Sequence, residues 1–399
     1  MGNTILTPTI ISKEAAFQLE NTCVLGANVY RPLEGEFDKI GASLTFRKPV
    51  KFESFDSVDI TGNIQDVTEM SDTIVINKHK VVPFSFSEED LTLSIEDYSE
   101  RYIRPAVIKI ADDIDRSIAE LYKACNFTSG TAGTVPATFS ALSGLGQKMD
   151  DLAMPEEGRM LVLNPAANWS LADALKGTFE PKGAKDFLRR GYLGNIANFD
   201  IMKTQSIYSH TAGGGLATGT TNTSGTVYVN SSDGLTATIT VDAATAAAVS
   251  VGDVFTIANM YAVNPISKQT TSHLMQFTVT TAVATASTTN QDIVVSPAIY
   301  TSGPYQNVDA APANSAAITL VGSHSANLAF TKNAFALAMA PIRAFTGSKS
   351  LEMHNVTHNG FALTVTMFAD GITLKQVCRI DARWGVKVLY NDLACRLLG

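Results

Sequence analysis

The sequence predicts an α+β protein that carries a small all-β domain inserted into its chain. Three observations support this fold class. Residues 211–325 hold five acidic side chains and one basic side chain, although the whole chain has 30 Lys and Arg. A long amphipathic pattern runs from Tyr102 to Cys125, which predicts a helix. Alternating apolar residues on both sides of a turn predict a long β-hairpin at residues 44–86.

Length and charge limit the possible functions. At roughly 150 residues per domain, 399 residues correspond to two or three structural units. The net charge of −8 argues against a basic nucleic-acid-binding module, but it does not exclude a passive container for DNA, whose inner wall should repel the phosphates. The four cysteines form no C-x-x-C pair, which favours reduced thiols in a cytoplasmic protein. We expect no signal peptide and no membrane contact, because apolar runs fall short of the ~20 residues that a membrane helix needs.

Two segments precede the helix. Residues 1–35 show weak helical spacing and end at Arg31-Pro32, so we expect an N-terminal arm that gains order from a neighbour. In the hairpin, apolar residues alternate loosely between Val50 and Ile60, and a returning strand runs from Ile74 to Phe86. Gly62-Asn63 and the acidic stretch after Gln65 supply the turn. Because this ribbon is long and charged, we expect it to project and to pack on a surface outside its own domain.

The main helix is the clearest element. Its apolar residues recur in steps of three and four, and the opposite side carries charged residues that include Asp112, Asp113 and Asp115. Pro105 is expected in its first turn, after a shorter helix that starts near Ser87. The helix would span ~30 Å at 1.5 Å per residue.

Residues 135–210 and the C-terminal region predict mixed structure. We expect helices at Phe139–Met149 and Ala166–Leu175, a buried strand at Met160–Leu163, and a closing strand pair at Phe361–Phe368 and Val377–Val388.

The inserted region is poor in charge and rich in Ala, Thr, Ser and Gly. Strand patterns recur in it, separated by polar turns, at residues 226–230, 237–241, 253–257, 277–279 and 293–295. We expect a small β-barrel or sandwich, with a disordered linker as the alternative. The run Gly213–Gly215 is expected to be a hinge into this insert, because no helix follows it to bind a phosphate.

No motif indicates catalysis, a cofactor or a metal. His354 and His358 fall on a predicted strand or loop, where four residues span ~13 Å, too far for one ion. The segment Gly347–Ser350 lacks the Gly-Lys step of a phosphate-binding loop. Adjacent acidic pairs point their side chains apart. Trp384 is expected to be a core or interface anchor.

Four segments, in this order along the chain, resemble tailed-bacteriophage coat proteins. They are RKPVKFESFD with the returning strand up to Phe86, SIEDYSERYIRPAVIKIADDIDRSIAELY, VGDVFTIANMYAVNPISKQT with MQFTVTT, and VCRIDARWGVKVL. The sequence is similar to the major capsid protein with the Hong Kong 97-type fold, in the short-tailed-phage branch that has an inserted domain (the I-domain). The order of the segments, more than any one motif, carries this resemblance.

The resemblance implies an architecture. The expected parts are an N-terminal arm (1–35), an extended loop formed by the β-hairpin (36–86), the spine helix of a peripheral domain (87–134), the first part of an axial domain (135–212), the inserted β domain (213–318), the axial return (319–350) and the closing strands of the peripheral domain (351–399).

The resemblance also implies a function. The chain would self-assemble into hexamers and pentamers of an icosahedral shell, in the cytoplasm of a host bacterium, and remain in the virion. The implied partners are other copies of the chain, a scaffolding protein, a portal, and packaged double-stranded DNA that is contacted non-specifically. No enzymatic activity is implied. The open alternatives are a tail-tube or decoration protein, and an enzyme with a β insertion, which would need a set of convergent polar groups that the sequence lacks.

The residues expected at the inter-subunit interface follow from the hairpin. Apolar anchors and cations on it would meet acidic faces of a neighbour. The expected residues are Phe46, Phe52 and Phe55 as anchors, Arg47, Lys48, Lys51, Lys78 and Lys80 as cations, and Asp112, Asp113 and Asp115 as acidic partners. The alternative is a solvated hairpin whose charges contribute little.

Overall fold

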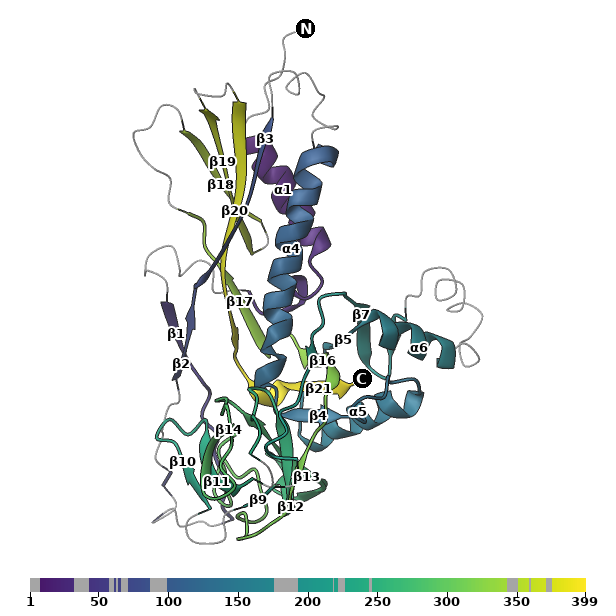
Figure 1. Cartoon of the computed structure of the whole chain (residues 1–399), viewed down its shortest axis with the longest axis vertical. Coiled ribbons are helices and arrows are strands. Elements are labelled where there is room, and N and C mark those ends of the chain that lie inside the picture. Colours follow the sequence, from purple (N-terminus) through teal and green to yellow (C-terminus); the bar gives the residue numbers. More distant parts are fainter. Residues whose placement is uncertain are drawn as a thin grey trace. The chain divides into compact units, whose positions relative to one another are not determined.

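The computed structural model describes thirteen stretches of the chain, which divide into two compact units (Figure 1). The described residues are 8–31, 43–56, 61, 64–65, 71–86, 99–175, 193–217, 219–221, 227–243, 246–342, 351–358, 360–370 and 375–399. Unit 1 comprises Met1–Phe46, Thr73–Ala119 and Phe335–Leu389, and unit 2 comprises Arg47–Asp72, Glu120–Ala334 and Tyr390–Gly399. No helix in these stretches is long and apolar enough to cross a membrane.

Unit 1 is built on a five-stranded antiparallel sheet. Its strands are β3 (Lys78–Phe86), β17 (Phe335–Met339), β18 (Leu351–His358), β19 (Phe361–Asp370) and β20 (Lys375–Val388). The long strand β20 pairs with β19 and then β17 along one edge and with β3 along the other. The predicted closing strand pair is therefore confirmed as β19 and β20, and Trp384 is fully buried as a core anchor.

Two helices pack on this sheet, α1 (Pro8–Thr22) and α4 (Arg104–Ala119), and Figure 1 shows both beside the strands. Pro105 lies in the first turn of α4, as predicted, where its missing N–H costs nothing. A π-helical turn at Ser99–Ile103 precedes α4, and the predicted end at Cys125 is replaced by a tighter 3₁₀ turn at Glu120–Ala124. The short helix expected from Ser87 falls largely outside the described residues.

The N-terminal arm packs on its own unit. Ile11, Ala15 and Leu19 of α1 are fully buried. After a 3₁₀ turn at Gly26–Asn28, the backbone of Tyr30 exchanges hydrogen bonds of 3.0 and 3.1 Å with β17. The expectation that this arm needs a neighbour is wrong for residues 8–31, because the apolar face of α1 is covered by the chain's own sheet and helix.

The predicted hairpin is shorter than expected. β1 (Ser43–Arg47) and β2 (Ser71–Val75) form a two-stranded sheet of their own, while residues 48–56 form no strand. Pro49 has no N–H to donate to a ladder, which explains why β1 ends where it does. The returning strand continues as β3 in the five-stranded sheet, where the ring of Phe84 stacks 6.1 Å from that of Tyr102. Most of the predicted turn lies outside the described residues.

Unit 2 contains two helices and a sheet with both parallel and antiparallel strands. Its strands are β4 (Phe127–Ser129), β5 (Arg159–Leu163), β6 (Asn195–Ile196), β7 (Phe199–Lys203), β8 (Ser209–His210), β16 (His324–Thr331) and β21 (Ala394–Leu398), in the order β4-β21-β16-β5-β7-β6 with β8 on β16. The helices are α5 (Phe139–Asp151) and α6 (Pro165–Leu175), and a 3₁₀ turn at Asn391–Leu393 leads into β21. The two predicted helices and the predicted strand at Met160–Leu163 are confirmed.

The insert folds as a β-barrel. Its strands are β9 (Thr220–Thr221), β10 (Tyr228–Asn230), β11 (Ala237–Asp242), β12 (Val254–Val263), β13 (Thr270–Val279), β14 (Gln291–Ser296) and β15 (Ile318–Leu320). The ring runs β11-β14-β13-β12-β15, and β9 closes it by pairing with β11 and by bridging from Thr220 to Ala317. The side chains of Phe255 and Phe277 face each other in register within its core, 6.0 Å apart. The barrel alternative of the sequence prediction is confirmed over the described residues.

Candidate subunit interface

The segment that follows β1 exposes two aromatic side chains. Phe52 is 64% exposed and Phe55 is 47% exposed, in a stretch without regular structure. Phe46, on β1, is half-buried. Large apolar side chains exposed close together on a short segment are typical of surfaces that a partner covers. The structure therefore keeps Phe52 and Phe55 out of the core, as an interface role requires.

Polar bonds give this segment a defined conformation. The backbone N–H of Glu53 donates to Oε1 of Gln65 at 2.9 Å, and Nε2 of Gln65 donates to the carbonyl of Glu53 at 2.6 Å. Nζ of Lys48 lies 3.8 Å from Oδ2 of Asp72. The two sides of the loop are thus joined within unit 2, and Arg47 stands exposed at the end of β1.

Lys51 has a partner in its own chain. Its Nζ lies 3.5 Å from Oδ2 of Asp392, and both side chains are about half exposed. Exposed ion pairs contribute only about 0–1 kcal/mol. Lys48 and Lys51, which were expected to face a neighbour's acids, therefore have partners within unit 2, but these contacts are weak enough to be exchanged.

Lys78 and Lys80 lie on a different element from Phe52 and Phe55. Both belong to β3, where they stand opposite Trp384 and Ala382 of β20. Lys80 is exposed and Lys78 is half-buried. The structure thus places the predicted interface cations on two segments, a loop in unit 2 and a sheet strand in unit 1.

Asp112 and Asp113 lie on the exposed side of α4, as predicted. Nζ of Lys109 is 3.0 Å from Oδ2 of Asp112 and 3.5 Å from Oδ1 of Asp113. The hydrogen bond that Lys109 donates to Asp112 raises the pKa of Lys109 above its usual value, and the negative charge of Asp113 adds to this shift. These carboxylates are solvent-accessible and partly neutralised.

Asp115 corrects the sequence prediction. It was expected on the exposed face, yet it is buried and accepts hydrogen bonds from the backbone N–H groups of Val24 at 2.8 Å and Gly26 at 2.9 Å. Burial raises the pKa of Asp115 to about 6, although these bonds counteract the shift. Its carboxylate fastens the N-terminal arm to α4 and is inaccessible to a neighbour's cations.

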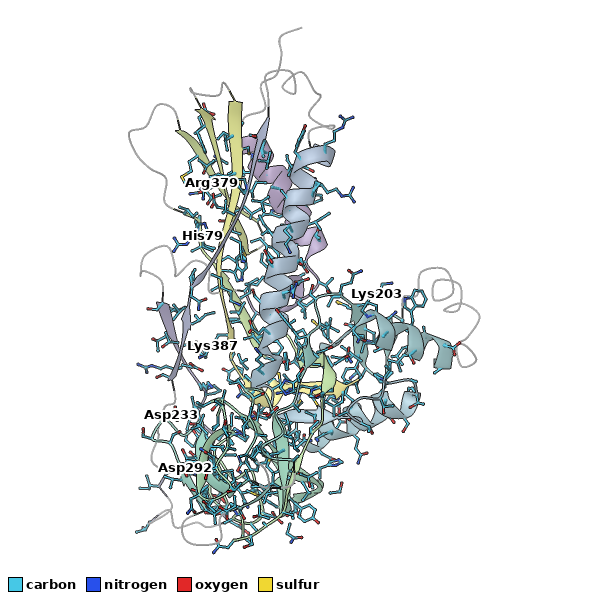
Figure 2. The ribbon with its side chains drawn as sticks, viewed as in Figure 1. His79, Lys203, Asp233, Asp292, Arg379 and Lys387 are labelled. Carbon is cyan, nitrogen blue, oxygen red and sulfur yellow. The ribbon has the colours of Figure 1, made fainter. Side chains whose placement is uncertain are left out.

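A cluster of polar side chains joins β3 to β20 on the sheet. Nε and Nη2 of Arg379 donate to both oxygens of Asp381 at 2.7 and 2.6 Å, and Nε2 of His79 lies 2.9 Å from Oδ1 of the same carboxylate. Figure 2 labels His79 and Arg379 on these two strands. Asp381 is buried, while His79 and Arg379 are partly exposed. Bidentate pairing of this kind fixes geometry as well as charge.

Unit 2 holds a buried polar network that no motif in the sequence indicates. The hydroxyl of Tyr122 lies 3.1 Å from Nδ1 of His210, and Nε2 of His210 lies 2.9 Å from Oδ1 of Asp253. Asp253 also accepts from the backbone N–H groups of Gly213 and Ser250. These residues lie far apart in sequence, on the turn after α4, on β8 and directly before β12, so no local spacing could have linked them.

Arg396 completes the network from β21. It is fully buried, its guanidinium lies 5.2 Å from the centre of the Tyr122 ring, and it donates to the carbonyls of Gly252 and Cys125 at 2.8 Å each. Burial lowers the pKa of Arg396 to about 10. Burying a charged arginine costs free energy, and the hydrogen bonds to the two carbonyls offset this cost only when the guanidinium lies in this position.

The order hydroxyl, imidazole, carboxylate is that of many hydrolase triads, but this network is structural. Tyr122, His210 and Asp253 are all buried, and burial raises the pKa of the Tyr122 phenol. A nucleophile must be able to reach a substrate. Among the described residues no group of three or more His, Cys, Asp or Glu side chains is placed to bind a metal ion.

The glycine run at the start of the insert packs closely against the backbone of Ala247 and Ala248. A Cβ on Gly213 would lie 2.3 Å from the carbonyl oxygen of Ala248, and its N–H is bound to Asp253. The expected hinge is therefore wrong for Gly213 and Gly215, whose missing side chains allow backbone to pack on backbone.

The family model described as P22 coat protein, gene protein 5, matches residues 3–395. The chain belongs to this family. It is a major capsid protein of a tailed phage, it assembles with copies of itself into an icosahedral shell, and it is located in the virion. It is a structural protein and not an enzyme. The α+β capsid fold with an inserted β domain, expected from the sequence resemblance, is confirmed by this membership and by the strand topology.

Individual relatives are distant. The major capsid protein of Acyrthosiphon pisum secondary endosymbiont phage 1 is 23% identical over 375 residues, which cover 88% of this chain and 87% of the relative. The structure from Mycobacterium phage Che8 is 13% identical, with a TM-score of 0.47 over 94% of this chain and 90% of that chain. The CUS-3 coat protein I-domain is 34% identical, with a TM-score of 0.19 over 28% of this chain and 97% of that chain.

Proposed function

We propose that this coat protein forms hexamers and pentamers by laying its extended loop across a neighbouring subunit. The observation that carries this proposal is the exposure of Phe52 and Phe55 on the segment between β1 and β2. An aromatic side chain buries 150–250 Å² when it is covered, so two of them can anchor a contact between subunits. A two-stranded sheet such as β1 with β2 is only marginally stable alone and gains from a partner surface.

The cations around the loop set the register of this contact in the proposal. Arg47, Lys78 and Lys80 would meet acidic side chains of the neighbour, with Asp112 and Asp113 as the accessible candidates on α4. Charge complementarity of this kind contributes more to specificity and association rate than to affinity. We also propose the division of the chain that the resemblance implies, from the arm at 1–35 to the closing strands at 351–399.

We extend the proposal to the partners of the shell. A scaffolding protein would guide assembly, a portal would occupy one vertex, and double-stranded DNA would fill the interior. The net charge of −8 supports a container that repels the phosphate backbone and contacts DNA non-specifically.

The test compares matched aromatic substitutions. The chain is expressed alone and with a scaffolding protein, and particles are counted by negative-stain electron microscopy and sedimentation. Phe52→Ser with Phe55→Ser should reduce closed shells at least tenfold while the thermal midpoint of the unassembled subunit changes little. Phe139→Ser, at a position that is 51% exposed on α5, is the control and should assemble as the parent does. Normal shells from the loop variant would refute the proposal.

A further inference from the structure

The peptide between Val75 and Ile76 lies directly on Gly385 of β20. A Cβ on Gly385 would stand 2.1 Å from the carbonyl oxygen of Val75 and 3.1 Å from Cα of Ile76. Carbon atoms reach ordinary contact with a neighbour only at about 3.5 Å or more, so no side chain fits between the two backbones. Ile74 and Ile76, on either side of Val75, are buried. The chain from β2 therefore passes over the face of β20 at one glycine.

A second fastening lies four residues away on the same strand. Asp381 and Gly385 share a face of β20, because successive side chains alternate across a sheet. The carboxylate of Asp381 is bound by His79 from β3 and by Arg379 from β20. The strand that returns from the extended loop is thus held at Val75–Ile76 by backbone packing and at His79 by a buried carboxylate.

We propose that Gly385 and the Asp381 cluster are positioning residues that fix where the base of the extended loop leaves the five-stranded sheet. This inference rests on the proposed function, in which the loop reaches a neighbouring subunit. A fixed base places β2 at one position on the five-stranded sheet, so the extended loop would start from the same point in every copy of the chain. The chain's own Val75–Ile76 peptide packs on Gly385. The extended loop positioned in this way would contact a second copy of the chain.

The experiment measures the position of the loop base in the unassembled subunit. Spin labels are placed at Ser43→Cys on β1 and Ile108→Cys on α4, both exposed, and the distance distribution is recorded by pulsed electron paramagnetic resonance. The four native cysteines are buried, so the labels react at the introduced sites. We expect one narrow distribution in the parent chain.

Gly385→Ala is the decisive variant. The Val75 carbonyl must retreat by about 1.5 Å to restore ordinary contact, so the base of the loop should move and the distance distribution should shift or broaden. Gly322→Ala is the matched control, because its added Cβ would lie 3.6 Å from the nearest atom, and its distribution should match the parent. A folded Gly385→Ala subunit with an unchanged distribution would overturn the inference.

A second variant covers the case in which Gly385→Ala does not fold. His79→Ala removes a partly exposed side chain and should broaden the same distance distribution and speed amide exchange in Lys78–Phe86. An unchanged distribution and exchange rate would likewise overturn the inference. Shell formation is scored separately. A shifted loop base with normal shells supports the positioning role of Gly385 but contradicts the proposed role of the loop between subunits. Failure of the inference can therefore be distinguished from failure of the proposed function.

Discussion

Oδ1 of Asp115 accepts a hydrogen bond of 2.9 Å from the backbone N–H of Gly26, which joins the spine helix to the turn after α1. The contact is also steric, because a Cβ on Gly26 would lie 3.4 Å from Ile114. The backbone N–H groups of Val24 and Gly26 stabilise a carboxylate that burial has removed from water. This arrangement makes the attachment of the arm sensitive to pH.

The first prediction concerns the direction of that sensitivity. The pKa of Asp115 is raised from 3.8 to about 6, so the folded chain binds more protons than the unfolded chain between these values. Its contribution to stability is therefore full below about pH 4 and is lost as the pH rises through 6, by on the order of 2–3 kcal/mol. Asp115→Asn cannot titrate, so the stability advantage of the parent over this variant should shrink between pH 4 and pH 7.

The measurement uses urea unfolding of unit 1 as a function of pH. Trp169→Phe leaves Trp384 as the sole tryptophan, and Trp384 lies in the core of unit 1, so its fluorescence reports on this unit. Asp113→Asn is the control at an accessible position of the same helix. A difference between parent and Asp115→Asn that stays constant or grows with pH contradicts the prediction.

The second prediction concerns His324 in unit 2. Burial lowers its pKa to about 4, and its Nδ1 lies 2.8 Å from the carbonyl of Gly322. The other groups that act on it are Arg396 from β21, His210 from β8 and Asp253 before β12, with the positive Arg396 opposing protonation. The folded chain binds fewer protons than the unfolded chain between pH 4 and 6.5, so stability falls as the pH falls through this window.

His324→Asn tests this effect. Its amide can keep the donor to Gly322 but cannot take up a proton in this range. Between pH 6.5 and 4 the parent should lose about 2–3 kcal/mol relative to the variant. The readout is amide exchange of β16 and β21 against pH. His354→Asn, on β18 of unit 1, serves as the control and should leave the exchange of these strands unchanged.

The third prediction concerns the cations of β3. Lys78→Glu with Lys80→Glu should reduce the rate and yield of shell assembly at low salt, because like charges would replace the proposed attraction. The thermal midpoint of the unassembled subunit should change by less than about 2 °C, since Lys80 is exposed and Lys78 is only half-buried, and charges that remain in contact with water contribute little to folding. Light scattering during assembly and calorimetry of the subunit supply the two readings. Lys332→Glu, an exposed lysine in unit 2, is the matched charge change, and equal losses in both assays would place Lys78 and Lys80 inside the fold.

The fourth prediction concerns Arg396. The three donors of a lysine radiate from a single nitrogen atom, so it cannot reproduce the arginine fork that reaches the Gly252 carbonyl from Nη1 and the Cys125 carbonyl from Nη2. Arg396→Lys should therefore destabilise unit 2 by about 2–4 kcal/mol, because a buried charge and a carbonyl lose a partner. Circular dichroism in urea measures the loss. Arg383→Lys, at a half-buried position on β20, should change stability by less than about 1 kcal/mol, and a similar loss in both variants would contradict the argument.

Periodicity predicted the elements well. The steps of three and four between Ile103 and Ile118 located α4, and strand patterns located β11 to β14, because both signals are local and strong. The buried Asp115 was misplaced because its position in the helical repeat falls beside charged neighbours, and only the tertiary contact with Val24 and Gly26 reveals its partner.

Long-range contacts were beyond local reasoning. The separation of β3 from the β1–β2 pair depends on its nine-residue register with β20, nearly 300 residues later. The Tyr122, His210 and Asp253 network joins three elements whose sequences carry no common spacing. The aromatic residues of the hairpin led to the prediction of an interface on the loop. The surface of a second copy that would contact them stays a prediction.

The closed ring of the insert has a consequence for a crowded particle. Each of β9, β11, β12, β13, β14 and β15 finds neighbours on both sides within one chain. Strands that leave backbone groups unpaired recruit foreign strands and seed aggregates. Many barrels can thus stand close together at very high local concentration without pairing through these six strands.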